Sequence, residues 1–349
     1  MGPHTFVHPR QALFDPDELV QASLPVCDHY AGVEARMKKS LQLQAEMGPV
    51  FDITLDNEDG APVGGEIEQA HLIQELLASP MNQFGRVGVR LLAVDHPKFA
   101  DVLAIVLKSW RRPAYLMCPK PRGLADLQRA IDIIDKLDGA ADATAAKATT
   151  GGAAAAPIPI HALVETHGAL AQVVALAAHP RVQSLSFGLM DFVSAHRGAL
   201  PRWAMSAEGQ FDHPLVVRAK LEIAAACHAH GKVPSHCVVT EFKDLRALTE
   251  AADKASRLLG YTRMWSIHPA QIKPIVDSFA PTVAEVDEAI HILQAAQAAQ
   301  WAPIRHHDTL HDRASYRFFW QVLQRAEATS FQGAAQLPAE LRMAWFGKH

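Results

Sequence analysis

Short apolar runs alternate with longer helical patterns along most of this chain, and this alternation limits its possible folds more than any other feature. The runs with the length and composition of strands are 23–27, 50–55, 87–92, 114–118, 158–164, 182–187, 235–239 and 264–267. The helical patterns between them include Glu66–Leu77, Leu124–Leu137, Leu170–Ala178, Pro214–His230 and Leu245–Leu259. Because parallel strands need a crossover connection, usually a helix, this order predicts an α/β fold with a parallel sheet.

Alternation alone does not separate a doubly wound sheet from a barrel, but two observations favour the barrel. The runs number eight, as a (β/α)₈ TIM barrel requires. Charged residues also follow most of the runs, and barrel enzymes gather catalytic groups from several strand ends on one face. These residues are Asp56, Glu58 and Asp59 after the second run, Arg90 in the third, Lys120 after the fourth, Glu165 after the fifth, Asp191 after the sixth and His268 after the eighth.

Two segments interrupt the alternation. The Ala-, Gly- and Thr-rich segment 138–157 is interpreted as a low-complexity surface insertion, since the Gly151-Gly152 pair argues against a helix extended by its alanines. After Pro281 the pattern is helical only, over Val283–Gln300 and roughly Ala314–Ala328. We therefore expect a barrel domain over 1–300 and a C-terminal helical arm or cap over 301–349.

Composition excludes several classes of function. The formal charge is −4 and the pI is about 6.5, so the chain offers no basic field for nucleic acid. The four cysteines do not form CxxC pairs, and no apolar run is long enough for a secretory signal or a membrane span. GxGxxG after a strand, GxxxxGK[ST] and GxSxG are also missing, which argues against dinucleotide, P-loop and serine hydrolase sites. The expectation is a cytoplasmic protein with a small-molecule substrate.

Glu165 and Asp191 are the candidate metal ligands. Each follows an apolar strand that should end at the same face of the barrel, in IPIHALVETHGAL and VQSLSFGLMDFV. Carboxylates of this kind suit Mg²⁺, which takes one or two protein carboxylates and keeps several waters. The alternative for each acid alone is a helix N-cap, but two acids in consecutive units favour a metal site. The histidines His306, His307 and His311 lie in a polar joint, for which an exposed loop is the ordinary explanation.

Other charged residues could complete such a site. Glu58 and Asp59 form either a solvated acidic turn or a group that organises the waters of a cation or supplies a base. Arg90 could hold the carboxylate of an α-keto acid with two parallel bonds, whereas Arg86 should lie near the other end of that strand. Lys120, between two prolines, is interpreted as a fixed charge or an ion-pair partner rather than a Schiff-base nucleophile.

Taken in order, these motifs resemble the HpcH/HpaI aldolase and citrate lyase β-subunit family, and most of all its CitE-like and malyl-CoA lyase branch. The succession is an ED turn, a VR strand, a PK turn, an ET strand end, an FGxxD strand end and then GYTRMWSIHPAQI…FAPTVAEVDEA. The likeness runs from about residue 50 to residue 300. Its most specific parts are Trp265–Ile272 and Phe279–Ala289.

The resemblance implies a barrel of the phosphoenolpyruvate-binding type, a homotrimer or hexamer, and Mg²⁺-dependent cleavage or formation of a bond between an acyl-CoA thioester and a keto acid. It implies that Glu165 and Asp191 bind the metal and that Arg90 contacts the keto acid. Glu58 and Asp59 match the family's acidic pair. Asp312 is the counterpart of an aspartate that serves a neighbouring subunit's site.

The chain departs from the family pattern at three places. The helix after the acidic turn offers Glu66, Glu68 and His71 where a lysine and an arginine are expected. SLPVCDHYAG has no arginine beside Ser23, where the family's first strand begins with Arg-Ser, and Leu92 occupies the position of an asparagine. The acyl and keto substrates therefore stay open. Two alternatives to a thioester lyase remain: a class II pyruvate aldolase acting on a free hydroxy-keto acid, and a catalytically weak subunit whose barrel serves assembly.

Overall fold

The computed structural model describes residues 7–15, 24–146, 156–329 and 337–347. The chain divides into two compact units, Gln21–Val276 and the combination of Met1–Val20 with Asp277–His349. No helix in the described ranges is long and apolar enough to cross a membrane.

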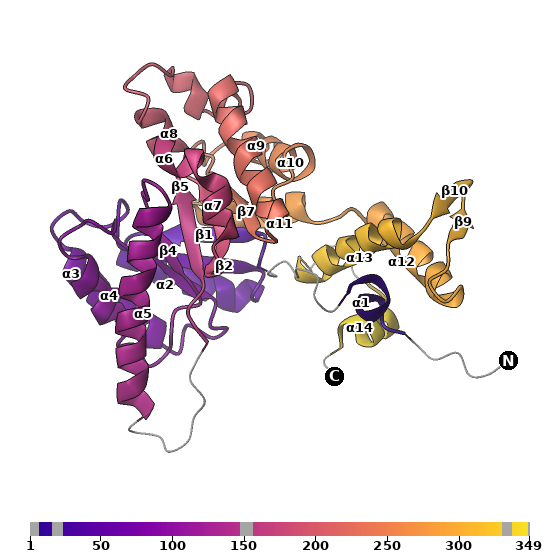
Figure 1. Ribbon diagram of the computed structural model, residues 1–349, viewed down its shortest axis with the longest axis horizontal. Coiled ribbons are helices and arrows are strands. Elements are labelled where there is room, and N and C mark those ends of the chain that lie inside the picture. The colour runs from indigo at the N-terminus through magenta and orange to yellow at the C-terminus, as the bar shows by residue number, and fades with distance from the viewer. Residues whose placement is uncertain (1–6, 16–23, 147–155, 330–336, 348–349) are drawn as a thin grey trace. The chain divides into compact units, whose positions relative to one another are not determined.

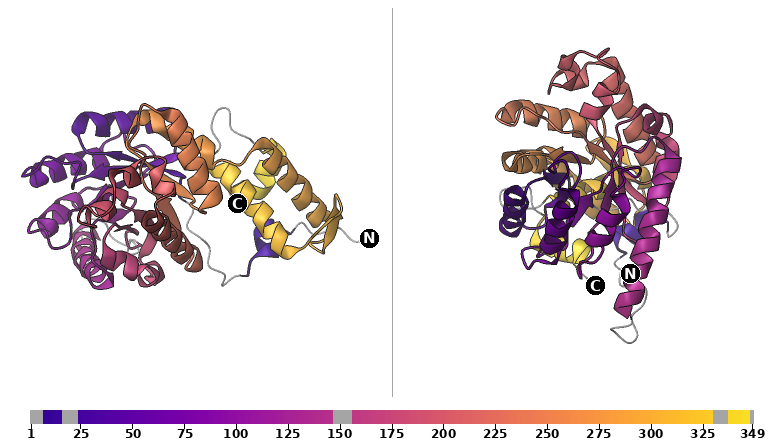
Figure 2. Two further views of the ribbon diagram at one scale, coloured as in Figure 1. Left: turned by 90° about the horizontal axis from the view of Figure 1, so that it is seen from above. Right: turned by 90° about the vertical axis from the view of Figure 1, so that its left-hand side faces the viewer.

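The larger unit is a closed barrel of parallel strands, each hydrogen-bonded to the next, with the last paired to the first. The strands are β1 (Cys27–Ala31), β2 (Phe51–Asp56), β3 (Val87–Arg90), β4 (Leu116–Cys118), β5 (Ile160–Val164), β6 (Val182–Phe187), β7 (Val233–His236) and β8 (Arg263–Ser266). Figures 1 and 2 show helices around these strands. This arrangement confirms the predicted (β/α)₈ barrel.

The barrel helices follow the strands in sequence order. They are α2 (Glu34–Met47), α3 (Glu66–Ala78), α4 (Phe99–Val106), α5 (Leu124–Ala146), α6 (His167–Ala171), α7 (Val173–Ala178), α8 (Leu189–Ser194), α9 (Pro214–Ala229), α10 (Leu245–Asp253) and α11 (Pro269–Phe279). Short 3₁₀ turns, Arg202–Met205 and Gly209–Phe211, lie between α8 and α9, and a π-helical turn, Lys254–Leu258, follows α10.

The first strand was predicted in the wrong place. The apolar run 23–27 suggested it, but β1 is Cys27–Ala31, whose alternate residues Asp28 and Tyr30 are polar. A strand buried on both faces normally appears as a continuous apolar run, which is why CDHYA was overlooked. The polar residue Asp28 is tolerated inside the barrel because it is neutralised there.

That neutralisation comes from the basal cluster, which we define as Asp28, Asp52, Arg86 and Arg263. Arg263 is fully buried, with Nη1 2.6 Å from Asp52 Oδ2 and Nη2 3.2 Å from Asp28 Oδ2. Arg86 Nε donates to the other oxygen of Asp52 at 2.7 Å. Asp28 Oδ1 also accepts from the hydroxyls of Thr54 and Tyr115. Two carboxylates and two guanidinium groups thus balance at the amino-terminal ends of the strands.

The predicted insertion at 138–157 is helical in its first part, because α5 continues to Ala146. The alanines of this segment have high helix propensity and extend the helix, contrary to our interpretation of a loop. The Gly151-Gly152 pair lies outside the described residues.

The smaller unit contains α1 (Pro9–Leu13), α12 (Val283–Ala298), α13 (Arg313–Ala328) and α14 (Ala339–Phe346), with a hairpin of β9 (Ile304–His306) and β10 (Thr309–His311). Its own hydrophobic core joins Leu13 of α1, Leu293 of α12, Trp320 of α13 and Trp345 of α14. The hairpin and α14 were not predicted, whereas the two long helices were.

Candidate active site

Charged side chains from five consecutive strand–helix connections meet at the carboxyl ends of the barrel strands. We call them the mouth cluster: Asp56, Glu58, Asp59, Arg90, Lys120, Glu165 and Asp191. Asp56 and Arg90 end β2 and β3, Lys120 follows β4, and Glu165 follows β5. Ion pairs join six of these side chains, and the backbone N–H of Lys120 binds the seventh, Glu165.

Arg90 is held by two carboxylates that bind its guanidinium. Nε and Nη2 donate to the two oxygens of Asp56 at 2.7 and 2.5 Å, and Nη1 lies 3.0 Å from Glu58 Oε2. The guanidinium also stacks over the ring of Tyr30, at 4.9 Å from the centroid. Arg90 is therefore rigid, and only Nη1 offers an edge at which another carboxylate could exchange with Glu58.

Asp56 has a structural task besides its ion pair. Its carboxylate accepts from the backbone N–H groups of Glu58 and Gly60, at 2.9 and 2.8 Å, and so shapes the turn after β2. A side chain on Gly60 would place its Cβ 2.2 Å from Asp56 Oδ2, so glycine is required for this close approach. This turn presents Glu58 and Asp59 to the mouth.

Lys120 neutralises the acidic side of the mouth. Its Nζ lies 2.6 Å from Glu58 Oε1, 2.9 Å from Asp59 Oδ1 and 3.8 Å from Asp191 Oδ1. Burial alone would lower the pKa of Lys120, but Glu58 and Asp59 outweigh it and hold the pKa above its ordinary value. The ammonium is therefore a fixed charge, as the ion-pair interpretation requires, and a poor candidate for a neutral amine nucleophile.

The two carboxyls beside Lys120 respond in opposite directions. Burial raises the pKa of Glu58, although Arg90 and Lys120 act against it. For Asp59, which is half-exposed, the ammonium of Lys120 outweighs burial and lowers the pKa. Asp59 is therefore ionised at neutral pH and has a face open to solvent.

Glu165 is the most perturbed acid of the site. It is 2% exposed, and burial first and the neighbouring Asp191 second raise its pKa to about 8. Its Oε1 accepts from the backbone N–H of Lys120 at 2.7 Å. A Cβ on Gly188 would lie 2.2 Å from Oε2, so the glycine before α8 makes room for this carboxyl.

The mouth cluster has five carboxylates but only two cationic side chains. Among the described residues no three His, Cys, Asp or Glu side chains converge as a complete metal-binding group. Mg²⁺ does not need one, since it accepts one or two carboxylates and completes its shell with water and substrate oxygens. Glu165 and Asp191 are hard-oxygen donors in a site with excess acid, and they therefore fit a divalent cation. Its charge would favour the ionised form of Glu165, which burial and the neighbouring Asp191 oppose.

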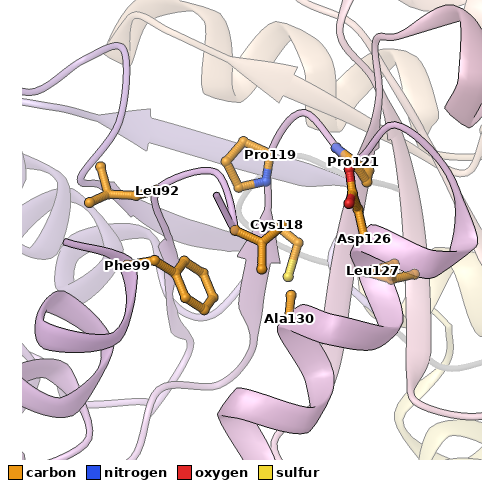
Figure 3. A pocket seen from close by; sticks show the side chains of 9 residues that line it. Leu92, Phe99, Cys118, Pro119, Pro121, Asp126, Leu127 and Ala130 are labelled. Carbon is orange, nitrogen blue, oxygen red and sulfur yellow. The ribbon is translucent and has the colours of Figure 1, made fainter. Parts of the chain in front are cut away.

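Leu92 does not leave an opening in the site. It is 4% exposed and lines a cavity of about 10 Å³ together with Phe99, Cys118, Leu127 and Ala130. Figure 3 shows these side chains between the strand ends and α5, with Pro119 and Pro121 at the adjacent turn. Leu92 thus packs in the layer between strands and helices, and the buried thiol of Cys118, whose pKa is raised to about 12 by burial, is an unreactive part of that layer.

An aromatic pair inside the barrel was missed by sequence reasoning. The rings of Tyr30 and Trp265 stack at 4.7 Å, and Trp265 packs on Met117 and Leu163. Among the described residues, the Tyr30 hydroxyl donates only to the sulfur of Met117, and the buried indole nitrogen of Trp265 has no hydrogen-bond partner. A correct placement of β1 would have shown Tyr30 on the same inward face as Asp28.

The C-terminal candidates lie in the smaller unit. Asp312 is the N-cap of α13, where its carboxylate accepts from the N–H groups of Ala314 and Ser315. His306 and His311 lie on the β9–β10 hairpin with ring centroids 6.4 Å apart. In the barrel, His268 stacks on Phe242 at 5.3 Å.

Comparison with known proteins gives the class of this barrel. The family model for HpcH/HpaI aldolase/citrate lyase matches residues 49–269, from β2 to the start of α11. This chain belongs to the HpcH/HpaI aldolase/citrate lyase family. It is accordingly a carbon–carbon lyase, as its motifs predicted.

The similar proteins include a malyl-CoA lyase and citrate lyases. An L-malyl-CoA/beta-methylmalyl-CoA lyase of Cereibacter sphaeroides is 28% identical over 71% of this chain and 77% of the relative. A crystal structure of a citrate lyase from Burkholderia xenovorans LB400 is 53% identical, with a TM-score of 0.80 over 96% of this chain and 98% of that one. The CitE protein of Mycobacterium tuberculosis, solved with magnesium, acetoacetate and coenzyme A, shares the fold, with 19% identity and a TM-score of 0.65 over 88% and 99% of the two chains.

Proposed function

We propose that this lyase cleaves or forms a 3-hydroxyacyl-CoA thioester, yielding an acyl-CoA and a 2-keto acid, with Mg²⁺ held by Glu165 and Asp191. The observation that carries the proposal is the mouth cluster, in which two adjacent hard-oxygen donors lie beside an arginine suited to a carboxylate. The names of the relatives support the substrate class, because malyl-CoA and beta-methylmalyl-CoA are 3-hydroxyacyl thioesters.

The bound metal would act as a Lewis acid that stabilises charge on the substrate's oxygens. Arg90, fixed by Asp56, orients the carboxylate of the keto-acid half through Nη1, at the edge now facing Glu58. Glu58 and Lys120 adjust the charge around that carboxylate.

Proton transfer falls to Asp59 in this proposal. Its ionised, half-exposed carboxylate takes the proton of the substrate hydroxyl as the carbon–carbon bond breaks. The new carbonyl belongs to the keto acid, and the bonding electron pair passes to the thioester, which is then protonated on carbon. Asp312 is the second candidate for this base, supplied by a neighbouring subunit of a homotrimer or hexamer in the cytoplasm; in the structure its carboxylate caps α13.

A class II aldolase acting on a free hydroxy-keto acid is the second candidate. The observation that favours it is β1, which carries no arginine and instead presents Tyr30 toward Arg90. The metal carboxylates would serve both reactions, so only the coenzyme A half of the substrate separates them.

The proposal is tested by turnover of acetyl-CoA or propionyl-CoA with glyoxylate, and of hydroxy-keto acids, with and without Mg²⁺. We expect Mg²⁺-dependent thioester chemistry that Glu165→Ala abolishes, whereas Glu75→Ala, at an exposed position of α3, keeps it. Turnover of hydroxy-keto acids alone would show that the chain is the class II aldolase and not a lyase of thioesters. No turnover of either substrate class would favour the assembly subunit.

A further inference from the structure

The turn after β4 has an unusual backbone at Lys120. This residue binds Glu165 through its backbone N–H, and Glu58 and Asp59 through its ammonium. Lys120 has φ of 50°, in the left-handed region that non-glycine residues seldom adopt. It also precedes Pro121, and the residue before a proline prefers an extended conformation. Such a conformation persists only where the surrounding structure fixes it, and it is commonly found at functional sites.

Three contacts join this turn to the segment that carries Glu165. The Lys120 N–H donates to Glu165 Oε1 at 2.7 Å, and Thr166 Oγ1 donates to the carbonyl of Pro121 at 2.7 Å. The third is a close backbone approach, since a Cβ on Gly168 would lie 2.0 Å from the carbonyl oxygen of Arg122. The turn and the start of α6 therefore form one rigid clamp, which we define as Pro119–Arg122 with Glu165–Gly168.

The clamp controls the carboxyl of Glu165 from one side while the backbone of Gly188 limits it from the other. Oε1 is bound by the Lys120 N–H, and the space beside Oε2 is only as large as glycine allows. The left-handed backbone directs the N–H inward while the Lys120 ammonium reaches Glu58 and Asp59. The main chain and the side chain of Lys120 thus serve different acids.

We propose that Lys120 is a positioning residue whose backbone N–H, held by the left-handed conformation, presets Glu165 for a divalent cation independently of its ammonium. This inference rests on the proposed metal function of Glu165. The lysine of the PKP sequence would then have two roles. Its backbone must adopt the left-handed conformation, and its ammonium supplies a fixed charge.

The test compares variants that share the loss of the ammonium but differ in backbone preference. Lys120→Gly and Lys120→Asn tolerate a positive φ, whereas Lys120→Val opposes it. We expect Mg²⁺ affinity, measured by titration calorimetry on the full chain, to be about tenfold or more weaker in the valine variant than in the glycine variant, the usual size of effect for a group that orients a metal ligand. The asparagine variant should group with glycine.

Arg197 provides the matched control, because it is exposed and has φ of 55°. Arg197→Gly and Arg197→Val should bind Mg²⁺ equally, although both change a left-handed residue. If Lys120→Val does not fold, Lys120→Ala against Lys120→Asn makes the same comparison with a smaller steric conflict. Equal Mg²⁺ affinity within the folded Lys120 pair overturns the inference, whereas failure of the parent chain to bind Mg²⁺ overturns the proposed metal function instead.

Discussion

The barrel encloses two clusters of charge, one at each end, and they differ in balance. In the basal cluster, Asp28 and Asp52 face Arg86 and Arg263, and the central guanidinium of Arg263 is fully buried. In the mouth cluster, five carboxylates face only Arg90 and Lys120, and several of these groups are partly exposed. Both clusters are made of the same kinds of side chain.

The difference shows what a functional cluster needs. A balanced, buried cluster has no use for a further ion, and breaking it leaves an uncompensated charge in a medium of low dielectric constant. In the mouth cluster, burial first and the neighbouring Asp191 second raise the pKa of Glu165, so that a bound cation would favour its ionised form. We therefore assign the basal cluster to stability and the mouth cluster to catalysis.

The largest effect should come from Glu165→Gln. We expect activity to fall by at least about 10³-fold, because a bound divalent ion contributes several kcal/mol of transition-state stabilisation and about 1.4 kcal/mol corresponds to a factor of ten. The metal-free variant should unfold at the same temperature as the parent or higher at pH 8.5, since a buried charge is removed. A large loss of thermal stability would place Glu165 with the structural acids.

Asp52→Ala should produce the opposite pattern. Its removal leaves Arg263 buried beside Asp28 alone, and breaking a buried pair in this way costs about 3–5 kcal/mol. Urea unfolding measures that loss, and the Mg²⁺ affinity of the molecules that remain folded should not change. Unaltered stability would show that the basal cluster contributes little.

Gly188→Ala tests the space around Glu165. The added Cβ would lie 2.2 Å from Oε2, and overpacking of this kind costs about 1–3 kcal/mol. We expect weaker Mg²⁺ binding together with a lower free energy of unfolding. Gly139→Ala is the control, because its Cβ meets nothing within 4 Å and α5 should gain about 0.5–1 kcal/mol from alanine. Unchanged Mg²⁺ affinity in Gly188→Ala would mean that the carboxyl has room to move.

Over one pH unit, the pH dependence of metal binding should be the smallest effect. Glu165 has a pKa of about 8 in the folded, metal-free chain and an ordinary value of 4.5, so the folded state binds the extra proton between these limits. Its contribution to stability therefore falls as pH rises from about 4.5 to about 8 and is constant above. Mg²⁺ must displace that proton, so affinity should rise by up to about tenfold per pH unit below pH 8 and level off above it. Calorimetry in buffers of different ionisation enthalpy would measure the proton release, and its absence at pH 7 would contradict the raised pKa.

The barrel itself could be predicted because seven of its strands carry apolar runs close to the observed positions. β1 could not, since its inward residues Asp28 and Tyr30 are polar and their partners, Arg263 and Arg90, are far away in the sequence. Hydrophobic periodicity contains no information about such distant neutralisation. Two further elements were missed for local reasons. The glycines after residue 138 indicated a loop, although the alanines there favour the helical extension of α5. The histidine-rich segment 306–311 was interpreted as an exposed loop, although it contributes to the β9–β10 hairpin.

The members of the mouth cluster could be proposed from their places after strands, but their contacts could not. Asp56, Glu58 and Arg90 were grouped by strand order, and the structure adds that Asp56 binds both Nε and Nη2 of the guanidinium. The left-handed backbone of Lys120 has no signal in PKP, because the residue before a proline normally favours extended structure. Such details depend on tertiary contacts that no short motif specifies.

We expect the mouth of this lyase to bind one divalent cation through Glu165 and Asp191. Titration calorimetry with Mg²⁺ and pyruvate measures this binding directly, on the parent chain and on Glu165→Gln, Asp191→Asn and the surface control Glu75→Ala. We expect one Mg²⁺ per chain in the parent and in the control, and none in the two mouth variants. Full Mg²⁺ affinity in folded Glu165→Gln, or no binding to the parent, would contradict the assignment of Glu165 and Asp191 as metal ligands.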